Sequence, residues 1–424
     1  MERTRYSDFS AALHRQVAAR RVPANGAIEV TRRCPLACAH CYNNLPAQDT
    51  RARAAELTFD DHRRILDEIT AAGCLWLLYT GGEIFARSDF LDIYTYAKRK
   101  GLLVTLFTNG TLITPRIADH LARWRPFCIE ITIYGAAAQT HDRITGVPGS
   151  YEQCLRGVGL LMERGLPLAL KTMALTLNQR EIPAMKRFVE EELGLRFRFD
   201  AMLNCRVDCS QGPLAVRLPP RGIVELDIRD PKRAAEWRKL AERTFGRVSP
   251  PNDEIYHCGA GINFFAVDPY GKLTPCLLSQ TDAYDLRTGS FAEGWKTTLR
   301  EVRCRERTRT TKCVACEMKA MCGMCPPNGQ LENGDPEEPV DFLCRVAHLR
   351  AHALGLDIPP HGGCEYCKTG VAYEELIRGT AVSTNDGLAD SVGRRWTSNE
   401  RKERRPNQQE ALCEAGNQAG AVTT

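Results

Sequence analysis

The chain has 424 residues, of which 43% are hydrophobic and 26% charged, close to the averages for soluble proteins. Its 57 basic and 52 acidic residues are mixed along the sequence and leave a net charge of +5, which argues against a nucleic-acid-binding protein. There is no uncharged apolar run of about 18 residues, and the Arg-rich N-terminal stretch lacks the apolar core of a secretory signal. We therefore expect a cytoplasmic protein without a membrane partner.

The cysteine content is unusual for such a protein. Nineteen cysteines in a long chain without a secretory signal indicate metal or redox chemistry in a reducing compartment rather than a disulfide framework. The length accommodates one domain of about 200 residues and a smaller second one.

Between residues 27 and 203, short apolar runs alternate with amphipathic helical segments, the pattern of βαβ units around a parallel sheet. The predicted strands are Ala27–Thr31, Cys74–Thr80, Leu102–Thr108, Cys128–Tyr134, Leu168–Thr176 and Arg196–Met202. The fold class is α/β, and six such units predict a partial (β/α)6 TIM-like barrel with its chemistry at the carboxyl ends of the strands. Lys171, a charge inside the fifth apolar run, points either into the barrel or to an exposed strand face.

The remaining segments divide by composition. We expect an N-terminal extension (1–25), the strand-helix core (26–205), a connecting helical segment (206–255) and a small cysteine-rich domain (256–350), whose few apolar runs mean that metal supplies much of its core. Residues 370–424 are rich in Arg, Glu, Asn, Gly and Ser, which predicts a disordered tail.

A CX3CX2C motif follows the first predicted strand directly. Cys34, Cys38 and Cys41 lie within eight residues on a loop. Three thiolates can hold three irons of a [4Fe-4S] cube and leave the fourth iron open to a reacting molecule. The alternatives are a zinc site completed by His40, or cysteines without a metal role.

The motif and three others that follow in order resemble the radical S-adenosylmethionine (SAM) superfamily. His40 occupies the place of the aromatic residue that precedes the third cysteine in this family. The resemblance implies cofactor contacts from loops at successive strand ends, with the methionyl amino group of SAM near the second strand and its ribose near the fourth. The corresponding residues are Gly81, Gly82, Glu83, Asn109 and Thr132. Ile84 replaces the family's proline after Glu83.

The C-terminal cysteines resemble the SPASM extension, which binds one or two auxiliary [4Fe-4S] clusters in this superfamily. The resemblance assigns one cluster to Cys313, Cys316, Cys322 and Cys344, and the other to Cys258, Cys276 and Cys325. The second set is one ligand short, so its fourth position is either open to substrate or filled by His257, Cys205, Cys209 or Cys304. A zinc ribbon is the alternative for the CX2C pairs. Cys364 and Cys367 form a further CX2C pair without an assignment.

The resemblance implies that one electron enters bound SAM and releases a 5′-deoxyadenosyl radical, which abstracts hydrogen from a substrate. The stretch from Glu130 through Ser150 resembles SPASM enzymes that mature ribosomally made peptides by crosslinking or epimerisation, so we expect a peptide substrate. We also expect a separate small peptide-recognition carrier protein and an electron donor such as flavodoxin or ferredoxin.

Three alternatives stay open. They are haem or tetrapyrrole side-chain modification, sulfatase maturation, and a non-catalytic iron-sulfur or zinc-binding module. Sulfatase-maturing enzymes carry an aspartate directly after the cysteine that corresponds to Cys276. Leu277 stands in that place here, which disfavours sulfatase maturation.

Overall fold

The computed structural model describes residues 5–244, 254–316 and 318–380. The chain forms two compact units. The described part of the first comprises residues 5–217 and 256–305, and that of the second comprises 218–244, 254–255, 306–316 and 318–380. Each unit is described by itself below.

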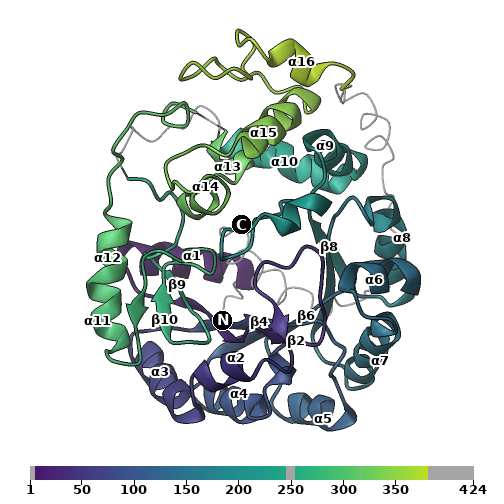
Figure 1. Ribbon diagram of the computed structural model, residues 1–424, viewed down its shortest axis with the longest axis vertical. Helices are drawn as coiled ribbons and strands as arrows, with labels where there is room; N and C mark the ends of the chain where they lie inside the picture. The colour runs from purple at the N-terminus through teal and green to yellow at the C-terminus, as the bar shows by residue number, and fades with distance from the viewer. Residues whose placement is uncertain (1–4, 245–253, 317, 381–424) are drawn as a thin grey trace, which may run out of the picture. The chain divides into compact units, whose positions relative to one another are not determined.

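The first unit is built on a nine-stranded sheet with the strand order β11-β10-β9-β1-β4-β5-β6-β7-β8. Its parallel part follows chain order from β1 to β8 and confirms the six predicted strands (Figure 1). Their bounds are β1 Asn25–Thr31, β4 Trp76–Gly81, β5 Leu103–Thr108, β6 Cys128–Thr132, β7 Leu168–Met173 and β8 Arg196–Asp200. The sheet has two edges, β8 and β11, so it is the open, partial barrel that the sequence predicts.

Helices follow the strands and cover the outer face of this sheet, as Figure 1 shows for α3, α4, α5 and α7. The helical segments are α2 Thr50–Ala55, α3 Phe59–Ala71, η1 Ile84–Ala86, α4 Phe90–Arg99, α5 Pro115–Arg123, α6 Ala138–Thr145, α7 Ser150–Glu163, η2 Gln179–Glu181, α8 Ile182–Arg187, the π-helical turn η3 Phe188–Glu192 and η4 Gly212–Val216. Thr58 begins α3 with a capping box to Asp61, which satisfies the amide donors that a helix start leaves open.

The two faces of the sheet differ in chemistry because successive side chains point to opposite sides of a strand. Tyr79 on β4 packs edge-on against Phe90 of α4, with ring centroids 5.5 Å apart, so the face of Tyr79 is the helix-covered one. By register, that face also carries residues that are 0–1% exposed, namely Ile28, Leu77, Leu106, Ile129 and Leu170. The opposite face is more polar: beside Ala27, Leu78 and Phe107 it carries Glu29, Thr80, Thr105, Glu130, Lys171 and Arg198.

Three strands beyond the predicted core extend the sheet past β1. β9 Phe264–Val267 pairs in parallel with β1, and β10 Lys272–Thr274 and β11 Tyr284–Asp285 continue it in antiparallel fashion. Helices α11 Phe291–Lys296 and α12 Thr298–Arg303 follow, and α1 Tyr6–Ala19 precedes β1. The region predicted as one cysteine-rich domain, 256–350, is therefore divided: residues 256–305 belong to the first unit because β9 completes its sheet.

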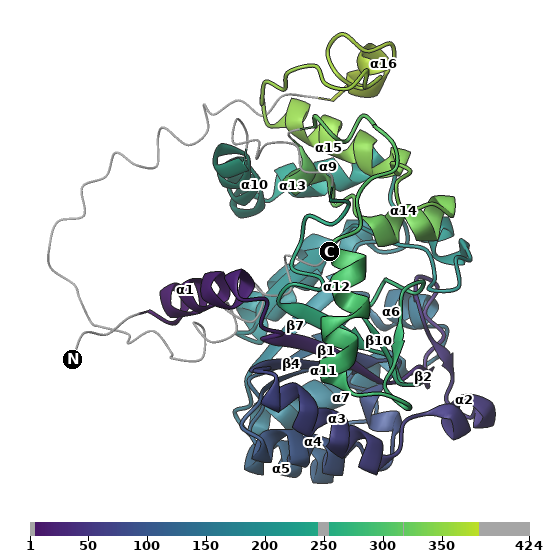
Figure 2. The same ribbon diagram turned by 90° about the vertical axis from the view of Figure 1, so that its left-hand side faces the viewer.

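The second unit is helical. It contains α9 Pro220–Arg229, α10 Pro231–Thr244, α13 Lys319–Cys322, α14 Pro326–Asn333, α15 Asp341–Ala353 and α16 Tyr373–Ile377. Helix α15 contacts α9, α13 and α16, and Figure 2 shows it beside α9. The buried Arg350 of α15 joins these helices: its guanidinium bonds Asp227 of α9 at 2.8 Å and the Met321 carbonyl of α13 at 2.6 Å. Helix α16 falls in the segment predicted to be disordered, of which residues 381–424 lie outside the described part.

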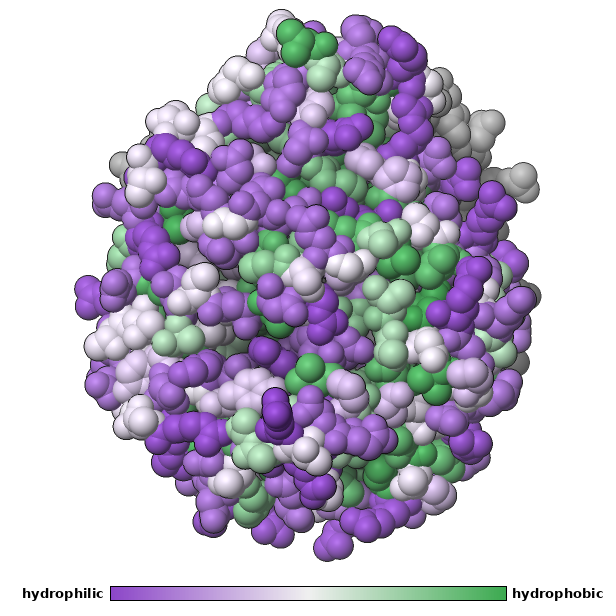
Figure 3. Space-filling view, in the orientation of Figure 1, coloured by the Kyte–Doolittle hydropathy of each residue, from purple (hydrophilic) through white to green (hydrophobic). Residues whose placement is uncertain are grey.

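Among the described residues, no helix is long and apolar enough to cross a membrane. Figure 3 shows one face of the protein, on which hydrophilic residues predominate and hydrophobic residues form separate patches.

Candidate active site

The three cysteines of the CX3CX2C motif lie together at the end of β1. Cys34 ends the short strand β2 (Arg33–Cys34), which pairs with β3 (Leu45–Pro46), and Cys38 and Cys41 follow on the loop between them. Burial, then the nearby Glu83 carboxylate, raises the pKa of the Cys34 thiol to about 12. Burial and the other two thiols raise the pKa of Cys38 as well. Bound metal offsets this cost because it replaces the thiol proton, so the loop fits a thiolate-bound cluster.

Hydrogen-bond donors surround the first of these sulfurs. The Leu36 amide lies 3.4 Å and the Asn109 side-chain Nδ2 3.5 Å from Cys34 Sγ. N–H donors of this kind stabilise cluster sulfurs and tune their reduction potential. The His40 ring packs edge-on against Tyr134, with ring centroids 4.8 Å apart. Burial lowers the pKa of its imidazole to about 4, so the ring is neutral. Its Nδ1 is buried without a hydrogen-bond partner in the described part of the chain.

The segment 141–150, which is part of the stretch that resembles peptide-maturing enzymes, supports the cysteine loop directly. The Ala37 and Ala39 amides donate to the carbonyls of Thr145 and Ile144 at 2.8 and 3.0 Å. Gly146, with φ of 70°, ends α6 in a left-handed turn. Asp142 fixes the start of α7 by accepting bonds from amides, including that of Tyr151 at 2.9 Å. The segment therefore helps to fix the conformation of the cysteine loop.

Arg206 holds the other end of the loop, a role that sequence analysis did not assign. Its guanidinium donates to the Cys41 carbonyl at 3.1 Å and to the Asn44 side chain and carbonyl at 2.9 and 3.0 Å. The Val207 amide adds a bond to the Tyr42 carbonyl at 2.9 Å. The only sequence signal is an arginine shortly after the sixth strand, which does not distinguish it from a surface cation.

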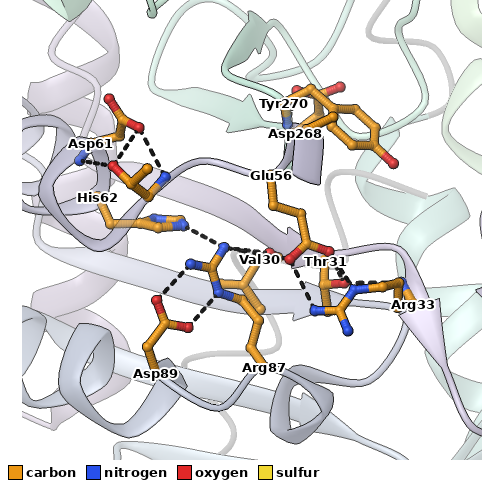
Figure 4. Close-up of polar contacts among 12 residues, drawn as sticks. Val30, Thr31, Arg33, Glu56, Asp61, His62, Arg87, Asp89, Asp268 and Tyr270 are labelled. Atoms are coloured by element: carbon orange, nitrogen blue, oxygen red, sulfur yellow. Dashed lines mark hydrogen bonds and ion pairs between the residues drawn. The ribbon is translucent and has the colours of Figure 1, made fainter. Parts of the chain in front are cut away.

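Arg33, the residue before Cys34, belongs to a buried ionic network (Figure 4). Arg33 forms a two-pronged ion pair with Glu56, with Nε–Oε1 and Nη2–Oε2 distances of 2.8 and 3.0 Å. Thr31 donates to the same carboxylate at 2.5 Å, and Arg87 Nη1 lies 3.8 Å from it. Arg87 also pairs with Asp89 at 2.7 Å. Because these buried charges are paired with opposite charges at short distances, the network fixes the end of β1 and the start of the cysteine loop.

The loops after β4 and β5 carry the residues expected to contact SAM. A side chain on Gly81 (φ 136°) would meet the Thr31 carbonyl oxygen at 2.1 Å, and one on Gly82 would meet the carbonyl oxygens of Arg32 and Arg33 at 2.5 Å. The resemblance assigns both glycines a contact with SAM, which stays a prediction. In the structure, their lack of a side chain also lets this loop approach the backbone that leads into the cysteine loop.

Glu83 connects the loop after β4 to the loop after β5. Its buried carboxylate accepts bonds from Thr108 Oγ1 at 2.7 Å and from the amides of Asn109 and Phe85 at 2.8 and 3.2 Å. Burial raises its pKa although these donors oppose the shift. Thr132 is half-buried at the end of β6 and lies opposite Lys171 in register. The SAM contacts of these residues remain predictions.

Lys171 lies on the polar face of the sheet. Its Nζ is 3.0 Å from Glu130 Oε2 and 2.9 Å from the centre of the Phe107 ring, and Arg198 bonds the same carboxylate at 2.6 Å. Burial lowers the pKa of Lys171 to about 8. Burial would raise the pKa of Glu130, but the two cations hold it below its ordinary value. These charges can orient polar groups of a substrate.

Two of the three cysteines predicted for the incomplete auxiliary cluster lie in the first unit. Cys276 and Cys258 are close enough to interact electrostatically, and burial, aided by Cys258, raises the pKa of Cys276 to about 11. Cys325 lies in the second unit, so its participation remains a prediction. The candidates for the fourth ligand all belong to the first unit and differ in exposure: Cys205 is buried, whereas Cys209 and Cys304 are exposed.

The other auxiliary set gathers within the second unit. Cys313 interacts electrostatically with Cys316, Cys322 with both, and Cys344 with Cys322. Burial raises the pKa of Cys322 to about 12, so this thiol gives up its proton only where a bound metal cation replaces it. The arrangement of these cysteines fits the predicted four-cysteine cluster.

Comparison with known proteins agrees with this geometry. The Radical SAM superfamily matches residues 28–189. An AdoMet-dependent heme synthase from Methanosarcina barkeri is 28% identical over 335 residues, which are 73% of this chain and 94% of that protein. A PqqA peptide cyclase from Ruegeria pomeroyi is 32% identical over 262 residues, 60% of this chain and 67% of that protein.

Among solved structures, Streptococcus suis SuiB bound to its precursor peptide SuiA superposes with a TM-score of 0.61 at 17% identity, covering 81% of this chain and 82% of that one. That likeness concerns the fold. With the cysteine loop and the relatives above, it leads to one conclusion: this chain is an enzyme of the radical SAM superfamily, of the SPASM type, that uses a [4Fe-4S] cluster and SAM.

Proposed function

We propose that this enzyme abstracts hydrogen from a ribosomally made peptide, leading to a crosslink or an inverted stereocentre. The observation that carries the proposal is the position of the three-thiol loop. It lies at the carboxyl end of β1, bonded to the loops after β4 and β5, at the strand ends where a polar sheet face begins. A site at these ends suits a substrate whose polar groups must be oriented.

When bound, the cluster supplies an electron to SAM and so provides the hydrogen-abstracting radical. The residues of this chain do the rest. Cys34, Cys38 and Cys41 hold the cluster, and Asn109 donates a hydrogen bond to the first sulfur. On the polar face, Lys171 and Glu130 offer a cation and an anion for polar groups of the substrate.

The peptide assignment is supported by the PqqA peptide cyclases, one of them 32% identical to this chain. A specific observation favours a second candidate. The M. barkeri heme synthase aligns over 94% of its own length, so haem or tetrapyrrole side-chain modification is the alternative. A separate peptide carrier and a flavodoxin- or ferredoxin-type electron donor belong to the peptide proposal.

The first experiment tests the chemistry. The protein is reconstituted anaerobically, its iron is counted, and 5′-deoxyadenosine is measured by mass spectrometry after addition of reductant and SAM. We expect product from the native chain and none from the triple variant Cys34→Ala, Cys38→Ala, Cys41→Ala. Product that persists in the triple variant would refute the site.

The second experiment separates the substrates. Synthetic precursor-like peptides, with and without a purified carrier, are compared with an iron porphyrin that bears carboxylate side chains. A peptide that loses two hydrogens, or takes up solvent deuterium, while 5′-deoxyadenosine forms would support peptide maturation. A mass change confined to the porphyrin would overturn it in favour of the alternative.

A further inference from the structure

Four potential metal ligands that no predicted cluster uses converge in the second unit. They are His348, His361, Cys364 and Cys367, and one ligand atom from each lies within 4.8 Å of the others. All four side chains are buried. His348 comes from the middle of α15, whereas the other three come from the loop that follows it.

His348 is prepared for coordination. Its Nδ1 lies 2.8 Å from the Cys344 carbonyl one turn earlier, so this nitrogen carries the proton and donates it. The Nε2 lone pair then faces Cys364 Sγ at 3.6 Å and Cys367 Sγ at 3.7 Å. A hydrogen bond from the distal ring nitrogen to a carbonyl is the usual support of a metal-bound histidine.

His361 presents its ring differently. Its Nδ1 lies 3.1 Å from the Pro359 carbonyl and 3.4 Å from Cys367 Sγ, and its Nε2 lies 3.9 Å from the same sulfur. Metal–ligand distances of about 2.0–2.3 Å place tetrahedral ligands roughly 3.3–3.8 Å apart. The separations in this group therefore fit one ion, whereas thiolates on different corners of an iron-sulfur cube lie further apart.

The loop itself is shaped to present these ligands. A side chain on Gly362 (φ 51°) would meet the Lys312 Cα at 2.7 Å, so the turn between His361 and Cys364 requires glycine. The Cys367 amide bonds the Cys364 carbonyl at 3.3 Å, which closes the turn between the two thiols. An ion pair from Lys312 to Glu365 at 2.7 Å anchors the loop.

We propose that His348, His361, Cys364 and Cys367 form a structural zinc site, distinct from the iron-sulfur clusters. Two thiolates and two imidazoles are a zinc ligand set, and four protein ligands leave no open position, as in structural sites. The ion joins the loop after α15 to that helix, next to the auxiliary cysteines: Cys344 bonds Cys364, and Cys316 bonds His361. The proposal is independent of the substrate.

The test is metal analysis of the anaerobically purified full chain by mass spectrometry, with zinc and iron counted separately. We expect one zinc per chain in the native protein. The double variant Cys364→Ser, Cys367→Ser loses the zinc but keeps its iron and its iron-sulfur absorption. His348→Ala loses zinc too, and the matched control His352→Ala, one turn further along α15, keeps it.

A conservative variant covers the case in which these changes impair folding. His361→Cys leaves a three-cysteine, one-histidine set that also binds zinc, so it should retain the ion. Cobalt substitution of this variant and of the native chain should give the absorption bands of a tetrahedral thiolate site. Loss of about four irons per chain from the double variant, without zinc in the native chain, would assign these residues to a cluster and overturn the proposal. Iron-loaded native protein that neither contains zinc nor takes up cobalt would overturn it as well.

Discussion

Replacing Glu56 by alanine tests whether the buried ionic network holds the cysteine loop. The Glu56 and Arg33 side chains are only 5% and 8% exposed, and their ion pair has two short contacts of 2.8 and 3.0 Å. Arg87 keeps Asp89 as a partner after the change, but Arg33 is left buried without its counter-charge. Removal of one partner from a buried pair costs about 3–5 kcal/mol of folding free energy.

For a unit of this size, we expect the melting temperature to fall by roughly 6–20 °C, measured by circular dichroism under anaerobic conditions. Glu56→Gln keeps hydrogen-bonding atoms without the charge and should fall between the native protein and Glu56→Ala. Because Arg33 precedes Cys34, iron content and 5′-deoxyadenosine formation should fall together with stability.

The control for Glu56→Ala is an exposed pair in the same region. Asp60 and Arg63 are 84% and 49% exposed at a distance of 3.2 Å, so Asp60→Ala should leave both melting temperature and iron unchanged. A Glu56→Ala protein with native melting temperature and native iron would refute the reasoning.

Three further predictions concern neighbouring parts of the site. Gly82→Ala should reduce iron retention and SAM cleavage, because its new methyl group would lie 2.5 Å from two carbonyl oxygens of the backbone that leads into the cysteine loop. The control Gly159→Ala, whose methyl group would meet no atom within 4 Å, should behave like the native chain in the same iron and product assays. The free energy of unfolding should rise as the pH increases from about 8 to 10.5, because the lowered pKa of Lys171 lets the native state release a proton that the unfolded state retains. Lys171→Met should flatten this part of the stability profile, measured by chemical denaturation, and an unchanged slope would contradict the shift. Asn109→Ala removes the donor 3.5 Å from Cys34 Sγ, so the midpoint potential of the SAM-binding cluster, followed by electron paramagnetic resonance, should become more negative; a native potential would show that this bond does not tune the cluster.

The sequence alone determined the six parallel strands and the location of the cysteine loop. Strand and helix periodicities are local, and each motif lies at a strand end that the pattern marks. The order of these motifs and the spacing of Cys34, Cys38 and Cys41 identified the superfamily before any contact was known. The resemblance of the C-terminal cysteines to the SPASM extension predicted that Cys313, Cys316, Cys322 and Cys344 form one auxiliary group, and their assignment to a cluster stays a prediction.

The tertiary structure decided which distant residues meet. Residues 264–267 become a strand because they pair with β1, far away in sequence, and no local pattern specifies such a partner. Arg206 and Glu56 look like surface charges in the sequence, but folding places them against the cysteine loop. The CX2C pair of Cys364 and Cys367 had no assignment because its two histidine partners come from a helix turn and a glycine-dependent loop. Local periodicity fixes which elements form, whereas long-range packing and hydrogen bonding fix which side chains share a site.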